Sequence, residues 1–306
     1  MKYLYGVTTA MVTPFDKNGA VELAKVRDLT EFLIAKGVHC LYPLGTTGEM
    51  FRLSLAERKQ VAETVVKTAD RRVTVYIHTG AMNEEDAIEL TQHAHAIGAD
   101  GAGVVTPAFF VANDRELEEY FVKIAASVPR DFPVYMYNIP QCAGNDLTAA
   151  VAQRVAYRCP NVVGIKYSFP DLIRTNEYLG INDGTASIVS GIDRLFLTIL
   201  AMGCAGTVSG VACAYPEPFV ALYDAFKEND LVKARQIQKL AGKYCEVLRN
   251  GSNMSYYKEA LRLRGVDVGY MKRPQLDLTE AELAEMKAAL AKINREAEQL
   301  LQIKLS

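Results

Sequence analysis

The residue of this sequence best placed to do covalent chemistry is a lysine at the end of an otherwise uncharged run. The run Val162–Ser168 carries Lys166 near its carboxyl end. A lysine is almost never fully buried unless it is paired, and desolvation lowers the pKa of its amine from about 10.4. A neutral amine is a nucleophile, so Lys166 is a candidate to form a Schiff base with a ketone or aldehyde. The alternative is a lysine paired with a nearby carboxylate.

A tyrosine is predicted to act beside this lysine. In the run Pro133–Pro140 the side chains alternate, so Tyr135 and Tyr137 share one face and Tyr137 lies nearer the carboxyl end. A phenol with a pKa of about 10 can pass a proton to and from an imine, particularly when a threonine hydroxyl connects it to solvent. We therefore expect Tyr137 to meet Lys166, with a core-filling role as the alternative.

A third candidate is the turn-forming sequence Leu44–Glu49. Gly45 and Gly48 allow a tight turn, in which two adjacent threonine hydroxyls and the backbone amides can face one small anion. It is not a phosphate P-loop, because the glycine spacing is wrong and no Lys-Ser or Lys-Thr follows. The sequence predicts a small anion site here, with an ordinary strand–helix turn as the alternative.

Composition limits the kind of partner. Of 306 residues, 50% are hydrophobic, and 34 Lys and Arg nearly balance 36 Asp and Glu without a basic run. We therefore expect a folded protein that binds a small molecule, not nucleic acid or a membrane surface. Met1–Phe15 resembles neither a signal peptide nor a transmembrane helix, so we expect a cytoplasmic protein.

Neither a metal nor a bound cofactor is predicted. The six cysteines are scattered without a Cys-x-x-Cys, which favours reduced thiols, some of them buried. His93 and His95 are two apart in a predicted helix and point in different directions, while His39 and His78 are expected within strands. No His-Glu-x-x-His occurs, and no Gly-x-Gly-x-x-Gly follows a strand.

Eight short apolar runs supply the strands that would position these residues. Most are apolar along their whole length, as in strands that a parallel sheet buries on both faces. The runs are Gly6–Pro14, Val38–Leu44, Val73–Thr79, Gly101–Pro107, Pro133–Pro140, Val162–Ser168, Ser187–Gly191 and Gly206–Gly210.

Amphipathic segments alternate with these runs. The segments are Val21–Lys36, a helix opened by a capping box at Ser54–Glu57, Asn83–Ile97, Arg115–Val128, Asp146–Arg158, Leu172–Leu179 and Ile192–Met202. Eight strand–helix units without a linker favour a closed (β/α)8 barrel over an open doubly wound sheet. In such a barrel the active site forms at the carboxyl ends of the strands.

Only helices are expected after the eighth strand, near Glu217–Lys227, Asp230–Leu248, Ser255–Arg264 and Thr279–Leu301. We predict a barrel over residues 1–227 and C-terminal helices over 228–306 that pack on it. The last helix has an apolar stripe that needs a covering surface, and packing on the barrel is favoured over a free coiled coil. The stripe is Leu283, Met286, Leu290, Ile293, Ala297 and Leu300.

Three motifs in this order resemble the dihydrodipicolinate synthase and N-acetylneuraminate lyase family: Gly45–Glu49, Tyr137–Pro140 and Gly164–Lys166. The resemblance spans most of the chain, since it includes Thr9–Phe15, Val105–Pro107 and Lys258–Gly265. That family comprises (β/α)8 barrels with three extra C-terminal helices, usually tetrameric, that form a lysine Schiff base with pyruvate or a related 2-oxo acid.

The resemblance implies roles by position. Lys166 would form the imine, Tyr137 would shuttle the proton and Thr46 would join the hydroxyl relay. The covalent imine would need no metal and no other cofactor, and the protein would be a homotetramer. Thr47 and the turn amides would hold the 2-oxo acid carboxylate, and the Val208 backbone would approach it. The expected substrate-binding residues are Thr47, Gly48, Ser168, Gly191 and Val208.

The chain departs from the patterns of the named subfamilies. Dihydrodipicolinate synthases have an arginine two residues after the Tyr-Asn-x-Pro motif, where this chain has Cys142, and family members commonly have a second relay tyrosine where it has Phe109. Compared with sialic-acid lyases, Arg194 replaces an acidic residue and Gly210 replaces a serine. A pocket with Ser168, Asp193, Arg194 and Ser209 would suit another hydroxylated acid, such as a 2-keto-3-deoxy sugar acid.

The sequence thus predicts a pyruvate-type class I aldolase or lyase, or a 2-oxo acid dehydratase that uses the same imine. The alternatives are a dihydrodipicolinate (4-hydroxy-tetrahydrodipicolinate) synthase that binds its second carboxylate by another residue, and an N-acetylneuraminate lyase. A non-catalytic small-acid binder or scaffold is the alternative from a different class. The sequence leaves open the aldehyde partner, the direction of the reaction and the geometry of the oligomer.

Overall fold

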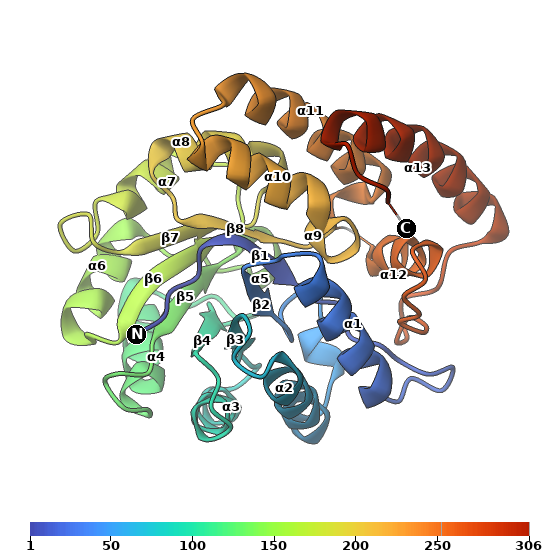
Figure 1. Ribbon diagram of the computed structural model, residues 1–306. Coiled ribbons are helices and arrows are strands. Elements are labelled where there is room, and N and C mark those ends of the chain that lie inside the picture. The colour runs from blue at the N-terminus through green and yellow to red at the C-terminus, as the bar shows by residue number, and fades with distance from the viewer. Residues whose placement is uncertain (252, 306) are drawn as a thin grey trace.

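The computed structural model describes residues 1–251 and 253–305, and it shows eight parallel strands closed into one barrel (Figure 1). Each strand pairs with the next along the chain, and β8 pairs with β1. The strands are β1 (Gly6–Ala10), β2 (Cys40–Tyr42), β3 (Thr74–His78), β4 (Gly101–Val105), β5 (Val134–Asn138), β6 (Val162–Tyr167), β7 (Ser187–Ser190) and β8 (Gly206–Ser209). The predicted (β/α)8 barrel is confirmed.

Helices connect the strands around the outside of the barrel (Figure 1). They are α1 (Leu23–Ala35), α2 (Leu55–Ala69), α3 (Glu84–Ala96), α4 (Asp114–Ala126), α5 (Pro140–Ala143), α6 (Ala149–Arg158), α7 (Leu172–Leu179), α8 (Phe196–Met202), α9 (Val211–Ala214) and α10 (Pro216–Lys227). The 3-10 turns are η1 (Met50–Arg52), η2 (Asp193–Leu195) and η3 (Arg249–Gly251). The capping box predicted at Ser54 is present, and a second one at Thr279 begins the last helix.

Some boundaries differ from the predicted ones for local reasons. Strand β2 is much shorter than the apolar run Val38–Leu44, and at its carboxyl end Leu44 has a φ of 66° and leaves the extended conformation. His39 was expected within the strand but lies just before it, and its Nδ1 accepts a hydrogen bond from the backbone N–H of Val7 at 3.1 Å. The helix expected over Ile192–Met202 is divided into η2 and α8, and the sequence analysis did not predict α5 and α9.

The barrel interior is packed by tyrosines against glycines. Tyr42, Tyr76 and Tyr135 are fully buried. A Cβ on Gly103 would lie 1.9 Å from the Tyr42 hydroxyl, and one on Gly101 would lie 2.3 Å from the Tyr76 ring. Since strand side chains alternate, these contacts fix which residues of each strand face inward.

This alternation also places the candidate catalytic residues. Tyr137 is two residues after Tyr135 on β5, and Lys166 is two residues after Gly164 on β6, whose Cβ position lies 2.6 Å from the Tyr135 ring. The two residues are register partners between neighbouring strands. Both therefore face the barrel interior near the carboxyl end.

The chain ends in helices α11 (Leu231–Val247), α12 (Met254–Leu263) and α13 (Glu280–Leu301), which gather on one side of the barrel in orange to red (Figure 1). Helix α13 packs on α11 and α10 and buries Met286, Leu290, Ile293 and Ala297 of its apolar stripe. The predicted packing of this helix on the body of the protein is confirmed. The predicted division at residue 227 falls between α10 and α11 and stays a prediction.

Substitution of one inward glycine should test this interior. Gly103→Ala should destabilise the protein by about 1–3 kcal/mol in urea unfolding, because its Cβ would overlap the Tyr42 hydroxyl. Tyr42→Phe in the same chain removes that oxygen and should restore part of the loss. Gly242→Ala in α11, where nothing lies within 4 Å of the added carbon, should stabilise by about 0.5–1 kcal/mol. Equal stability of Gly103→Ala and the parent chain would contradict the packing.

Candidate active site

Lys166 lies inside the barrel between two aromatic rings. It is 3% exposed, and its Nζ lies 3.9 Å from the centre of the Tyr137 ring and 4.4 Å from that of Tyr42. Among the described residues, no carboxylate lies within ion-pair distance of this amine. The geometry therefore favours the nucleophile over the paired lysine that the sequence left as an alternative.

Burial sets the protonation of this amine. Desolvation lowers the pKa of Lys166 to about 7, and the charge of Asp193 offsets only part of the shift. The two ring faces attract the ammonium form and act in the same direction as Asp193. Near neutral pH a large fraction of the amine is therefore uncharged and able to attack a carbonyl.

Tyr137 brings a protonated hydroxyl to this amine. Its side chain is buried, and its hydroxyl lies 3.5 Å from Oγ1 of Thr46. Burial raises the pKa of the Tyr137 phenol, while hydrogen bonding to Ser168 and Thr46 lowers it. The ring of His78 meets the Tyr137 ring edge-on, with centroids 6.0 Å apart. The structure thus brings Lys166, Tyr137, Thr46 and Ser168 together, as predicted from the strand ends.

The threonine turn after β2 is compact and tied to the barrel. The backbone N–H of Glu49 donates to the Thr46 carbonyl at 3.1 Å, and the Thr13 hydroxyl donates to the Gly48 carbonyl at 2.7 Å. A Cβ on Gly48 would lie 2.8 Å from the backbone nitrogen of Leu44, so a larger residue would open the turn. The amides and hydroxyls of this turn lie at the same end of the barrel as Lys166.

The ends of β7 and β8 close the opposite part of the site. A Cβ on Gly191 would lie 2.0 Å from the Ser168 hydroxyl, so these two predicted residues are in direct contact. A Cβ on Gly210, just after β8, would lie 3.2 Å from Oγ1 of Thr47. Val208 is buried in the interior cluster that also contains Tyr42. The candidate substrate-binding residues are therefore grouped around one end of the barrel.

A pocket of about 370 Å³ adjoins Gly191. Its lining residues are Pro170, Gly191, Ile192, Asp193, Arg194, Cys245 and Asn250. Burial raises the pKa of the Asp193 carboxyl to about 6, against hydrogen bonds from Ser209, Val211 and Thr207. Arg194 is turned towards the surface, where it donates to Asn250 at 2.9 Å and pairs with Glu246 at 3.3 Å. Asp193 therefore has no arginine partner in this pocket.

Three residues near the site had no predicted role beyond strand or motif membership. The ring of Tyr42 faces the amine of Lys166, and His78 is fully buried beside Tyr137. The ring of Tyr257, in α12, lies next to Gly210. Burial and the charges of Arg58 and Lys166 lower the pKa of His78, so its ring is neutral. Alternation along β2 and β3 could have placed Tyr42 and His78, whereas no local pattern shows where α12 packs.

The described residues contain neither a candidate metal site nor a candidate membrane span. No group of three or more His, Cys, Asp or Glu in residues 1–251 and 253–305 is arranged to hold a metal ion. Over the same residues, no helix is long and apolar enough to cross a membrane. The absence of a cofactor stays a prediction.

An eight-stranded barrel with a buried, partly uncharged lysine at a strand end defines the class of Schiff-base lyases and aldolases. The particular family follows from comparison with known proteins: the model of the Dihydrodipicolinate synthetase family matches residues 3–293, and the chain belongs to this family. It is therefore a class I aldolase or lyase of the pyruvate type, which confirms the family resemblance.

Individual relatives cover nearly the whole chain. A 4-hydroxy-tetrahydrodipicolinate synthase of Geobacter sp. (strain M21) is 35% identical, over 93% of this chain and 97% of its own. A prophage protein of the dihydrodipicolinic acid synthase family from E. coli K12, solved with pyruvate, has a TM-score of 0.90 at 29% identity, covering 95% of this chain and 99% of its own. A Ruminococcus gnavus sialic acid aldolase has a TM-score of 0.92 at 27% identity, covering 98% and 100%.

The buried amine predicts a specific pH dependence of stability. The unfolded chain keeps Lys166 protonated up to about pH 10.4, whereas the folded amine loses its proton at about 7. The stability cost of the lysine is therefore largest at and below pH 7 and fades as the pH rises towards 10. Lys166→Met should raise the free energy of unfolding, measured with urea, above that of the parent chain by a few kcal/mol at pH 6 and by little at pH 10.

An exposed lysine provides the control for this measurement. Lys233→Met, in α11, should change stability by less than about 0.5 kcal/mol at either pH. A Lys166→Met difference that stays the same from pH 6 to pH 10 would mean that the amine is not held uncharged by the fold.

Proposed function

We propose that this protein forms an imine between Lys166 and pyruvate or a related 2-oxo acid, and uses it to make or break a carbon–carbon bond or to eliminate water. One observation carries this proposal: the buried Lys166 amine lies against the ring of Tyr137, whose hydroxyl faces Thr46. A nucleophile, a proton donor and a hydroxyl relay are thus within one another's reach.

The reaction begins when the neutral Lys166 amine attacks the ketone carbon. One proton passes from the nitrogen to the oxygen, Tyr137 donates a second proton to the resulting hydroxyl, water leaves, and the protonated imine withdraws electrons from the neighbouring carbon. Loss of a proton or of an aldehyde from that carbon gives an enamine, which attacks the second substrate in the synthetic direction. Thr46 returns the proton to Tyr137. The chemistry needs no metal and no cofactor other than the covalent imine.

The carboxylate of the 2-oxo acid binds at the threonine turn in this proposal. Thr47 and the amides around Gly48 supply hydrogen-bond donors, and they lie between Lys166 and the end of β8. Ser168, Gly191 and the Val208 backbone surround the rest of the acid. These roles rest on the placement of the residues and on the family to which the chain belongs.

The rim of the site favours an uncharged, hydroxylated aldehyde as the second substrate. Cys142 in α5 cannot replace a bidentate guanidinium for a second carboxylate. Asp193 and Arg194 both line the pocket; the Asp193 carboxylate is a hydrogen-bond acceptor there, whereas the Arg194 guanidinium is paired with Glu246. A carboxylate repels an anionic aldehyde and accepts bonds from hydroxyl groups, so we propose a 2-keto-3-deoxy sugar acid as the aldol.

Synthase activity remains the second candidate, because the curated relatives with up to 35% identity carry the name 4-hydroxy-tetrahydrodipicolinate synthase. It would require another residue to bind the second carboxylate. N-acetylneuraminate cleavage is the remaining alternative.

Assembly as a homotetramer belongs to the same proposal, as does a cytoplasmic location. The loop after β4 carries Phe109, Phe110 and Val111 with exposed fractions of 80%, 77% and 86%. Apolar side chains exposed in a row mark a surface that another protein covers. Phe109 is exposed on the outside of its own barrel. Its phenyl ring has no hydroxyl, so it adds no proton donor to the site.

Imine formation is testable with pyruvate and borohydride. Trapping should add a reduced pyruvyl group to the peptide that contains Lys166, and Lys166→Met should abolish it. The initial rate at saturating pyruvate should rise with pH through about 7 and then level off, because only the free amine attacks. Tyr137→Phe should slow trapping by about 10²-fold or more. An unmodified Lys166 peptide at saturating pyruvate would contradict the proposal.

The second substrate can be identified by comparing an aldehyde partner without a carboxylate with one that carries a carboxylate. Cleavage of 2-keto-3-deoxy sugar acids should exceed condensation of pyruvate with aspartate semialdehyde, as measured by kcat/KM. Asp193→Asn should lower the former and leave the borohydride trapping of pyruvate nearly unchanged well above pH 7, where the Lys166 amine is uncharged in both proteins. Ordinary turnover with aspartate semialdehyde would instead identify a synthase.

A further inference from the structure

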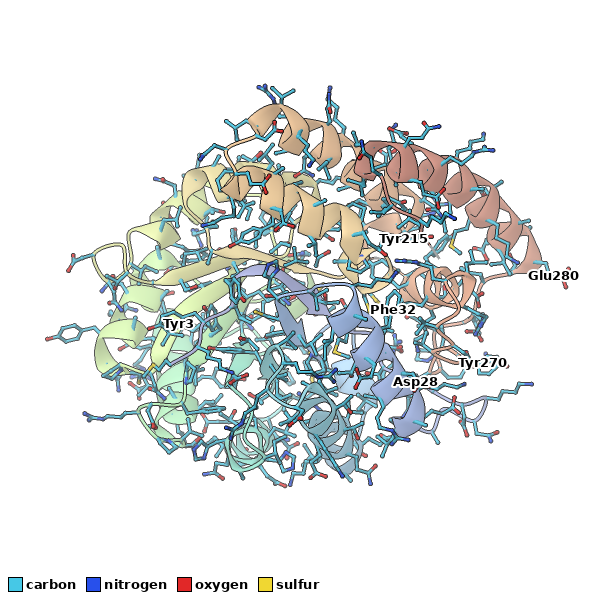
Figure 2. The ribbon with its side chains drawn as sticks, viewed as in Figure 1. Tyr3, Asp28, Phe32, Tyr215, Tyr270 and Glu280 are labelled. Carbon is cyan, nitrogen blue, oxygen red and sulfur yellow. The ribbon has the colours of Figure 1, made fainter. Side chains whose placement is uncertain are left out.

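Another buried lysine reaches the threonine turn from outside the strand–helix repeat. Lys258 of α12 is 1% exposed, and its Nζ lies 3.1 Å from Oε1 of Glu49, the last residue of the turn. The same amine donates to the Tyr270 carbonyl at 2.7 Å and lies 4.4 Å from the centre of the Phe15 ring. Figure 2 labels Tyr270 in the loop that follows α12.

Glu49 is held firmly on the side of the turn. Its other oxygen, Oε2, accepts from Arg52 at 2.7 Å, and Arg52 also donates to Gln275 at 3.1 Å. The Glu49 backbone has a φ of 59° and donates to the Thr46 carbonyl. The residue that carries the carboxylate is therefore tied through its own backbone to Thr46.

The same helix also borders the space beside Gly210. Tyr257 precedes Lys258, and its hydroxyl lies 3.1 Å from the position of a Cβ on Gly210, while Oγ1 of Thr47 lies 3.2 Å from that position. Helix α12 thus contacts the turn at Glu49 through Lys258, and Tyr257 and Thr47 line the same space beside Gly210.

The energetics of such a pair argue for a geometric role. A buried ion pair is often no more stabilising than apolar residues of the same volume, whereas removal of one partner costs about 3–5 kcal/mol. The pair therefore adds little net stability, but it forces the carboxylate of Glu49 to stay opposite the amine of Lys258. The ion pair thereby limits the positions that the turn containing Gly45 and Gly48 can adopt.

We propose that Lys258 and Glu49 are positioning residues: their buried ion pair holds the Gly45–Glu49 turn in the shape that receives the 2-oxo acid carboxylate. The C-terminal helices thereby take part in substrate capture. The ligand in this statement rests on the proposed function, whereas the mechanical constraint on the turn does not.

Substitution of Lys258 tests the positioning role through an affinity and rate comparison. In Lys258→Met and in Glu49→Gln, the pyruvate concentration for half-maximal borohydride trapping should rise about tenfold or more. The trapping rate at saturation should fall by a smaller factor, because Thr46 is the one residue of the proton relay that lies in the turn, and its dependence on pH should not shift, because neither residue contacts Lys166. Lys258→Arg keeps the charge and should lie nearer the parent chain than Lys258→Met.

A matched control lies at the end of the same helix. Arg264 follows α12 and donates to Glu217 of α10 at 2.9 Å, and its guanidinium lies 5.1 Å from the ring centres of both Phe32 and Tyr215, labelled in Figure 2. Glu217→Gln breaks this partly buried pair away from the turn. It should lower the thermal midpoint as Lys258→Met does, without raising the pyruvate requirement.

Hydrogen exchange separates this proposal from the proposed function. Without pyruvate, amides of residues 44–50 should exchange faster in Lys258→Met than in the parent chain or in Glu217→Gln. Faster exchange in a protein that pyruvate never modifies would refute the proposed function and support the constraint. Unchanged exchange together with an unchanged pyruvate requirement would overturn the positioning role.

A variant without either charge covers the case in which Lys258→Met does not fold. Glu49→Gln with Lys258→Met removes both fully buried charges of the pair, while Arg52, whose side chain is 26% exposed, keeps Gln275 as an acceptor, so this variant should fold. It should still show the faster exchange and the higher pyruvate requirement, because the constraint is lost with the pair. Parent-like values in this double variant would show that the pair only balances buried charge.

Discussion

An amine buried without a countercharge is the constraint on which the rest of this structure depends. A charged group in an apolar interior is so costly that it gives up its charge when its pKa can shift. The barrel meets this condition by surrounding Lys166 with the rings of Tyr42 and Tyr137 and keeping Asp193 beyond ion-pair distance. A closer carboxylate would keep the amine protonated and remove the nucleophile. The distance of carboxylates from Lys166 thus matters as much as the aromatic rings that contact it.

Lys258 shows how a partner changes the outcome for the same residue type. Burial lowers the pKa of both lysines, but Glu49 acts against that shift at Lys258 through charge and a hydrogen bond. With a carboxylate at 3.1 Å and the Tyr270 carbonyl at 2.7 Å, the amine of Lys258 has fixed partners and no room for a substrate. The paired lysine is suited to hold structure, and the unpaired one to react.

Sequence reasoning reached the parts of the site that follow from short-range rules. Strand alternation put Tyr137 on an inward face, a strand-end lysine indicated a nucleophile, and the glycines of the turn indicated a tight bend; the eight-stranded barrel placed their side chains at one end. The neighbours supplied by long-range packing were out of reach. The contacts of Lys258 and Tyr257 depend on where α12 docks, which no local pattern shows. The direction of Arg194 depends on Asn250 and Glu246, which are far along the chain.

The fold separates the residues proposed to make the imine from those proposed to select its partner. Tyr42 packs onto Gly103 and Tyr135 onto Gly164, so these interior residues cannot change singly without a clash or a void. Cys142 and Arg194 lie in exposed segments after β5 and β7, where a substitution disturbs little packing. Relatives named as a synthase and as a sialic acid aldolase share this barrel at TM-scores of about 0.9. Divergent partner specificity on a common imine site follows from this division, because the rim can vary while the interior stays fixed by its own packing.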